Sequence, residues 1–173
     1  DTHDAQGFAA LRHLTVGDFR DWLLDDGSLR AVALENGGDA AHPAMSTCTP
    51  VVYNGRAYIG VSGTGQFTPY SGHNITVIDL TGWRIAYSVP TQGYPQTSGL
   101  LTTAYGGKDG TVYVYFSDNY TPGKLRVLKD APGQTRAELT TEESYTVKGV
   151  TTTYTTPYVL FTPADAQAQY AIC

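Results

Sequence analysis

The stretch Thr47–Val89, TCTPVVYNGRAYIGVSGTGQFTPYSGHNITVIDLTGWRIAYSV, decides the fold class of this chain. Apolar and polar residues alternate in four short runs: Thr47–Tyr53, Arg56–Ser62, Asn74–Leu80 and Trp83–Val89. Alternation with a period of two predicts β-strands. Asn54-Gly55 separates the first two runs and favours a type I′ turn, which needs positive φ at both central residues. Thr81-Gly82 separates the last two runs, so the stretch predicts a four-stranded antiparallel meander.

A second, less regular copy of this pattern follows. It begins with a predicted strand at Gln96–Tyr105, a hairpin turn at Asp109-Gly110, and strands at Thr111–Ser117 and Lys124–Lys129. Aligning Gly55 with Gly110 and Ile75 with Leu125 gives an inexact period of about 50 residues, within the range of β repeat arrays. The outer strand of this copy has two candidates, Arg136–Leu139 and Ser144–Lys148. The apolar run Thr155–Phe161 has no place in the scheme.

The repeat predicts how the chain is organised, because a meander needs a neighbour on each face to bury both of its faces. We expect an N-terminal segment at 1–46 with a short helix at 15–26, a first unit at 47–95, and a second unit with an insertion at 96–168. Gln169–Cys173 is expected to be the first strand of a truncated third unit. The expected fold is all-β, built of four-stranded propeller-type blades.

The unit resembles the repeat of PQQ-like, or quinoprotein-type, β-propellers. Ser46–Tyr58 is similar to the opening of that repeat, and Thr76–Tyr87 is similar to its tryptophan-docking motif, in which Asp79, Thr81 and Gly82 match and Tyr87 stands in place of tryptophan. In the second unit, Lys129–Gly133 replaces the motif's turn. The resemblance implies six to eight blades around a channel, so it predicts that this chain is a piece of a longer propeller. An open β array completed by partners is the alternative.

Composition narrows the possible partners. The net charge is −5 and only 16% of the 173 residues are charged, with no basic patch, which argues against a nucleic-acid partner. The sequence contains no run of about 18 apolar residues, so it predicts no membrane-spanning segment. The 13 tyrosines and abundant threonine resemble the composition of exported bacterial proteins. We therefore expect an extracellular or cell-envelope protein whose partners are proteins, cell-wall glycans, itself or missing blades.

The patterns of catalytic and cofactor sites are not found in the sequence. Quinoprotein dehydrogenases hold PQQ and Ca²⁺, but this chain has no adjacent cysteine pair and no assignable aspartate with calcium partners, so PQQ-dependent activity and a bound cofactor are not expected. Gly60-Val61-Ser62-Gly63-Thr64 lacks the second glycine of a nucleophile elbow. The four histidines have no metal-ligand spacing. The expected function is therefore a non-catalytic interaction scaffold.

Aromatic residues in loops suggest an alternative function. The long connection Gly63–His73 and two later loops carry side chains that could stack on a sugar: Phe67, Tyr70, His73, Tyr94 and Tyr120. The alternative function is a carbohydrate-binding or glycan-processing module, although the same residues could equally cover the ends of the sheets. Tyr87 is expected to be largely buried, as an aromatic that covers a neighbouring turn. Cys48 and Cys173 are expected to be small core residues with free thiols, and a disulfide between them is the alternative.

Overall fold

A computed structural model of the chain describes residues 34, 46, 48–63, 68–106 and 109–164. The chain divides into two compact units, Asp1–Ala33 and Leu34–Cys173. All described residues belong to the second unit. The helix predicted at 15–26 and the strand predicted at 169–173 lie outside the described residues, as do Phe67 and Cys173.

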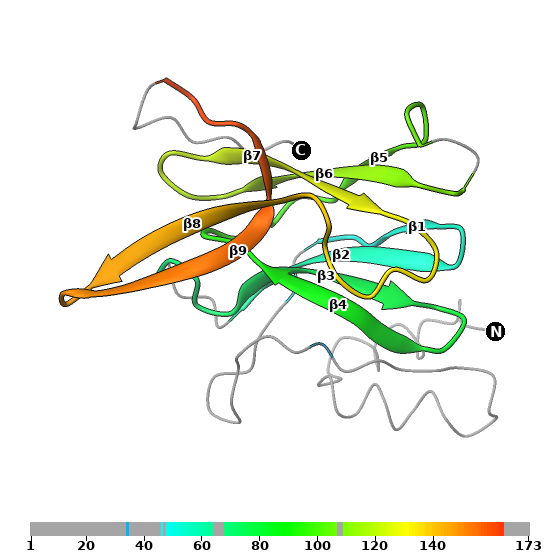
Figure 1. Cartoon of the computed structure of the whole chain (residues 1–173), viewed down its shortest axis with the longest axis horizontal. Helices are drawn as coiled ribbons and strands as arrows, with labels where there is room; N and C mark the ends of the chain where they lie inside the picture. The colour runs from blue at the N-terminus through cyan, green and yellow to red at the C-terminus, as the bar shows by residue number, and fades with distance from the viewer. Residues whose placement is uncertain (1–33, 35–45, 47, 64–67, 107–108, 165–173) are drawn as a thin grey trace, which may run out of the picture. The chain divides into compact units, whose positions relative to one another are not determined.

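The first sheet is an antiparallel meander in which neighbours in sequence are neighbours in space (Figure 1). Its strands are β1 (Val51–Tyr53), β2 (Arg56–Ser62), β3 (His73–Asp79) and β4 (Arg84–Pro90). The four predicted runs are confirmed, except that the first becomes strand only from Val51. Asn54 and Gly55 have φ values of 48° and 74°, which confirms the positive φ expected for a type I′ turn.

The second turn of this sheet is organised by Asp79. One oxygen of its carboxylate, Oδ1, accepts hydrogen bonds from the backbone N–H groups of Thr81 at 3.1 Å and Gly82 at 3.4 Å. An aspartate that accepts from the backbone two residues ahead forms an Asx-turn, which substitutes for a backbone turn. Asp79 thus ends β3, and it is hydrogen-bonded to the other matching motif residues, Thr81 and Gly82, in the connection to β4.

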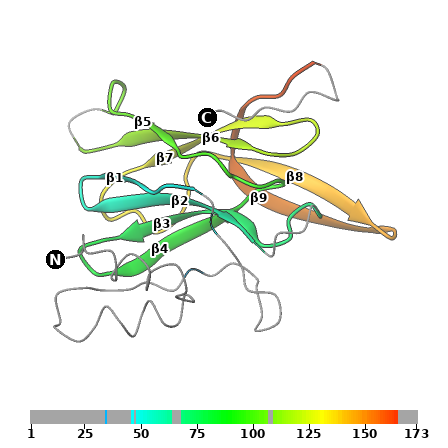
Figure 2. The ribbon, with the colours of Figure 1, turned by 180° about the vertical axis from the view of Figure 1, so that it is seen from behind.

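The second sheet has five antiparallel strands in the order β5-β6-β7-β9-β8. They are β5 (Leu100–Thr102), β6 (Val112–Asp118), β7 (Lys124–Asp130), β8 (Thr140–Val147) and β9 (Val150–Phe161). After β7 the chain first forms β8 at the edge of the sheet. It then turns back to form β9, which lies between β7 and β8 (Figure 2). The second unit is therefore not a simple four-stranded meander.

Three sequence predictions for this sheet are wrong in detail. The strand expected at Gln96–Tyr105 shortens to Leu100–Thr102. Arg136–Leu139 forms no strand, and Ser144–Lys148 falls mostly in β8, which pairs with β9 rather than with β7. The place beside β7 is taken by the apolar run that the repeat left unexplained, through the pairs of Leu125 with Phe161 and Val127 with Tyr158.

Each sheet contains one row of side chains with the pattern tyrosine–valine–tyrosine across three paired strands. In the first sheet, Val77 pairs with Tyr58 on one side and Tyr87 on the other. In the second, Val127 pairs with Tyr115 and Tyr158 in the same way. The tyrosine of β2 thus corresponds to Tyr115 of β6, two residues beyond the position given by aligning Gly55 with Gly110. We call the face that carries this row the front of each sheet.

The two sheets pack front to back. The front of the first sheet contributes Tyr58, Ile75, Val77, Tyr87 and Val89 to the core. The second sheet meets it with residues of the opposite face: Val112, Val114, Phe116 and Leu128. Ala57, Ile59 and Val61, on the back of the first sheet, are buried as well. Both faces of β2 are therefore buried.

Tyr87 is only 8% exposed, as expected, and its hydroxyl reaches the second sheet rather than its own turn. We expect Tyr87→Ala to lower the free energy of unfolding by about 3 kcal/mol or more, because it removes a large buried aromatic and a buried hydrogen bond. Urea denaturation measures the change. The matched control Tyr105→Ala, at a site that is 80% exposed, should shift it by less than about 0.5 kcal/mol. A loss below about 1 kcal/mol for Tyr87→Ala would show that this residue is not a core contact.

Candidate functional site

A buried carboxylate joins the two sheets at one end. Asp130 is the last residue of β7, and its side chain is fully buried. Arg56 of β2 donates to both carboxylate oxygens, from Nε at 2.9 Å and from Nη2 at 2.8 Å. The hydroxyls of Tyr58 and Tyr87 also donate to it, at 2.8 Å and 2.6 Å. We call these four residues, with Gln134, the Asp130 cluster.

Gln134 closes this cluster from the loop after β7. Its backbone carbonyl accepts from Arg56 Nη2 at 2.9 Å, and its side-chain amide donates to the carbonyls of Lys129 and Arg136. Burial raises the pKa of Tyr58 and of Tyr87, and acceptance by the Asp130 carboxylate raises both further. Both hydroxyls therefore remain protonated and act as hydrogen-bond donors. They hold the Asp130 carboxylate in place rather than preparing it for a chemical reaction.

A second cluster lies at the other end of the sheets, where three connections converge. Tyr70 N–H donates to the Gln92 carbonyl at 3.1 Å, and Asn119 N–H donates to the Tyr94 carbonyl at 2.7 Å. The ring of Tyr70 stacks on that of Tyr154, with centroids 3.8 Å apart and planes 3° from parallel. The connections that carry Tyr70, Tyr94 and Tyr120 thus meet at this end, with the Tyr70 ring packed against Tyr154.

Charged side chains support these aromatics. Arg126 is buried on β7; its Nε donates to Asp118 Oδ2 at 2.7 Å, and its Nη1 donates to Thr156 Oγ1 at 2.9 Å. Arg126 Nη2 lies 2.8 Å from Glu143 Oε2, in an ion pair without hydrogen-bond geometry. Glu143 also pairs with Lys124, and its Oε2 accepts from the Tyr70 hydroxyl at 3.4 Å. We call this group the Arg126 cluster.

The sequence-predicted ligand residues are placed as follows. His73 is buried at the start of β3, and its two ring nitrogens lie 3.0 Å from the carbonyl oxygens of Ser62 and Thr68. Its ring contacts Tyr94 edge-on, with centroids 4.3 Å apart. Tyr94 is itself buried, and Tyr120 is half-buried and follows Asn119, whose N–H donates to the Tyr94 carbonyl. The structure brings these residues to one end, with His73 and Tyr94 in the interior.

Sequence reasoning missed the residues that carry the charges at both ends. Asp130 falls in the segment Lys129–Gly133 that replaces the motif's turn, and Glu143 lies one residue before the predicted strand Ser144–Lys148. One signal was present: Arg126, Leu128 and Asp130 alternate along β7 and therefore share one face of the strand. A cation and an anion on the apolar face of a strand indicate buried ion pairs. Their partners come from distant strands, so the sequence could not name them.

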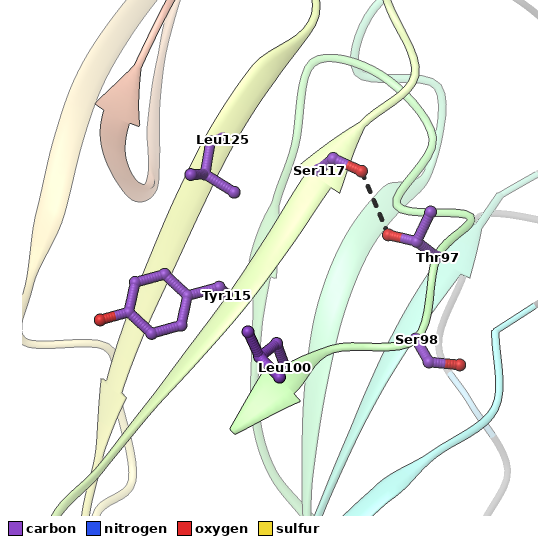
Figure 3. A pocket seen from close by; sticks show the side chains of 6 residues that line it. All are labelled: Thr97, Ser98, Leu100, Tyr115, Ser117 and Leu125. Atoms are coloured by element: carbon purple, nitrogen blue, oxygen red, sulfur yellow. Dashed lines mark hydrogen bonds between the residues drawn. The ribbon is translucent and has the colours of Figure 1, made fainter. Parts of the chain in front are cut away.

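A pocket of about 200 Å³ lies on the front of the second sheet (Figure 3). Six residues from the segment before β5 and from β5, β6 and β7 line it: Thr97, Ser98, Leu100, Tyr115, Ser117 and Leu125. The Thr97 and Ser117 hydroxyls are hydrogen-bonded to each other at 3.1 Å, so the surface that remains is mostly apolar. Such a surface suits an apolar side chain of a partner better than a charged ligand.

Within the described ranges, no group of three or more His, Cys, Asp or Glu side chains is arranged to hold a metal ion. No helix among the same residues is long and apolar enough to cross a membrane. Comparison of the chain with protein-family models, with curated proteins and with solved structures found no match. Function must therefore be argued from the geometry of this chain alone.

The thiol of Cys48 is free and half-buried, in contact with the carbonyl oxygens of Pro95 and Thr97. Burial raises its pKa to about 11, and a backbone hydrogen bond to Gly60 only partly offsets that effect. Gly60 allows this approach, because an added Cβ would lie 2.2 Å from the Pro95 carbonyl oxygen. The expectation of a free thiol is confirmed for Cys48, whereas its counterpart Cys173 lies outside the described residues.

We expect Cys48 in the native protein to react with iodoacetamide at pH 8 on the order of a hundredfold more slowly than an unhindered thiol, because its thiolate is scarce. Mass spectrometry of the labelled Cys48 peptide measures the rate. In denaturant without reductant, both Cys48 and Cys173 should label at ordinary rates. Labelling of neither thiol in that state would instead reveal a bridge between them.

The Arg126 cluster predicts a loss of stability in acid. Burial alone would raise the pKa of Glu143, but Arg126 and Lys124 outweigh it and hold that pKa below its usual range. The stability contributed by this ionised carboxylate is therefore present above its unfolded-state pKa of about 4.3, and is lost as pH falls through the lower folded-state value.

We expect Glu143→Gln to cost on the order of 2 kcal/mol at pH 7, because it weakens the pairing of a buried arginine that keeps Asp118 as a partner. Urea denaturation between pH 7 and pH 3 should show a steeper loss below about pH 4.3 in the parent than in the variant. Glu138→Gln, at an exposed glutamate, is the matched control and should reproduce the parent curve. Parallel curves for the parent and Glu143→Gln would rule out this coupling.

Proposed function

We propose that this chain is a non-catalytic, propeller-type segment that serves as an interaction scaffold in an exported or cell-surface protein. One observation supports the proposal above the others: two sheet units with matching tyrosine–valine–tyrosine rows pack front to back. In such a stack each unit offers its front to the next, as blades do around a propeller. The stack is open-ended, because packing of unlike faces does not close after two units.

The front of the second sheet is the surface that the scaffold offers. Leu100 is 68% exposed there, and Tyr158 and Phe161 are 40% and 51% exposed. Leu100 lines the pocket described above, and Phe161 pairs with Leu125, which also lines it. Exposed apolar surface of this kind is typical of protein interaction sites. The corresponding front of the first sheet is buried against its neighbour.

The polar clusters favour a structural role over catalysis. The Asp130 carboxylate accepts from four donor groups, and Glu143 is paired with two cations. General acid–base catalysis needs a group that can reach a substrate proton and change its charge near the working pH. The Asp130 carboxylate is instead enclosed by its donors, and Arg126 and Lys124 hold the pKa of Glu143 below its usual range. Export to the cell envelope is supported by composition alone.

We expect Leu100→Asp to abolish capture of a partner by the immobilised chain from a cell-envelope extract of its source organism. A charge placed on the apolar surface opposes burial of that surface. Because Leu100 lies exposed on an edge strand, the substitution should change the free energy of unfolding by less than about 0.5 kcal/mol. Proteins captured by the parent and the variant are compared by quantitative mass spectrometry.

Val147→Asp is the matched control, because Val147 is also exposed but lies at the far end of the β8–β9 hairpin. It should leave capture unchanged. Equal capture by the parent and Leu100→Asp would argue against this surface as the interaction site. Turnover of an alcohol or aldose by the purified chain with PQQ and Ca²⁺ would overturn the non-catalytic assignment.

A further inference from the structure

We infer that the front of the second sheet docks a further β-sheet layer, which brings a carboxylate to Tyr115, Tyr158 and Lys129. The inference rests on the proposed function, because it names the kind of partner that the scaffold's exposed face receives. It is carried by a comparison of the two fronts: the tyrosines of one are buried under the neighbouring sheet, whereas those of the other are partly exposed.

The occupied front shows what the row of side chains does. Tyr58 and Tyr87 flank Val77, and their hydroxyls donate to the two carboxylate oxygens of Asp130. That carboxylate belongs to the back of the neighbouring sheet. The tyrosine pair of one sheet thus receives an anion from the next, and the apolar side chains around it receive that sheet's valines, Phe116 and Leu128.

The front of the second sheet repeats this row, with Val127 4% exposed and Tyr158 40% exposed. Tyr115 and Tyr158 flank Val127, and the residue that pairs with the first tyrosine on the edge strand is also aliphatic in both sheets. That residue is Val51 beside Tyr58, and Leu100 beside Tyr115. Four paired positions therefore carry the same side-chain types. Figure 3 shows Tyr115 and Leu100 side by side at the pocket.

A positive charge also accompanies both rows. In the first sheet it is Arg56, two residues before Tyr58 and paired with Asp79. In the second sheet the corresponding pair is Tyr113 with Lys129. The cation of the second sheet, Lys129, thus lies on the middle strand of the row instead of on the strand of the first tyrosine. It is still on the front, two residues from the row. Two hydroxyl donors beside a cation are complementary to a carboxylate.

The difference in exposure indicates what is missing from the second front. Tyr87 is 8% exposed under its neighbouring sheet, whereas Tyr158 at the corresponding place is 40% exposed. A partner that fits must cover a surface as broad as a sheet and present an acidic residue at the end of one of its strands. A second sheet of the type β5–β9 has these properties, because its own back and Asp130 already fit such a front.

The test uses the full chain with a second copy of residues 91–164 appended after Cys173. The appended copy carries Tyr115→Phe and Tyr158→Phe, so that its peptides differ in mass from the original ones. Hydroxyl-radical footprinting then reads the accessibility of the original Tyr158. We expect its modification to fall about fivefold, as it would if its exposure fell from 40% to the 8% of Tyr87.

The matched control carries Asp130→Ala in the appended copy only, and should restore most of the modification of the original Tyr158. Amide hydrogen exchange of the appended β6 segment reports whether that copy has folded. A folded copy that leaves Tyr158 accessible overturns the inference, and so does a copy whose amides stay unprotected. Protection that survives Asp130→Ala would also overturn it, because the carboxylate would then have no role.

These outcomes separate the inference from the proposed function. Capture that depends on Leu100, together with an accessible Tyr158 in the extended chain, would leave the scaffold standing and exclude a sheet layer as its occupant. Capture that ignores Leu100, together with a protected Tyr158, would support the layer while removing the interaction site proposed for the natural partner.

Discussion

The stacking of the two sheets depends on one buried carboxylate. A charge removed from water costs several kcal/mol unless it is paired and hydrogen-bonded. Asp130 has four donor groups around it, and all of them come from the other sheet. Because Arg56, Tyr58 and Tyr87 are positioned by three-strand register, they meet the carboxylate only when the sheets are aligned in one way. The cluster therefore selects one packing among the many that apolar faces alone would allow.

Because of that packing, the two sheets have different surroundings. The front of the first sheet is covered, whereas the front of the second carries a similar row with its tyrosines partly exposed. A pair of sheets related by a two-fold axis would have buried two equal faces and ended the association there. In front-to-back packing, each added sheet instead has a front of its own that needs a neighbouring sheet to cover it. We propose a scaffold because the tyrosines on the front of the second sheet are partly exposed. The proposal does not depend on any catalytic group.

The other end of the unit is closed by a different device. Arg126, buried on the same face of β7 as Asp130, draws Asp118 and Glu143 into an ion-pair cluster. The long connection before β3 packs onto that cluster through the stacked rings of Tyr70 and Tyr154. Loop aromatics that suggest sugar binding from sequence thus cover a buried polar network, where their flat rings exclude water from the charges.

Local chemistry made the strands predictable from sequence. Alternation gave β2, β3, β4, β6 and β7, and Asn54-Gly55 specified its turn, because period and turn conformation depend on neighbouring residues. The burial of Tyr87 followed from the resemblance of its segment to a docking motif. Only the tertiary structure decided that β9 enters the second sheet before β8, that Tyr115 corresponds to Tyr58, and that Asp130 meets residues of the other sheet. These features depend on contacts between residues more than thirty positions apart, such as Val127 with Tyr158 and Tyr87 with Asp130, and no local pattern encodes which distant side chain completes a buried charge.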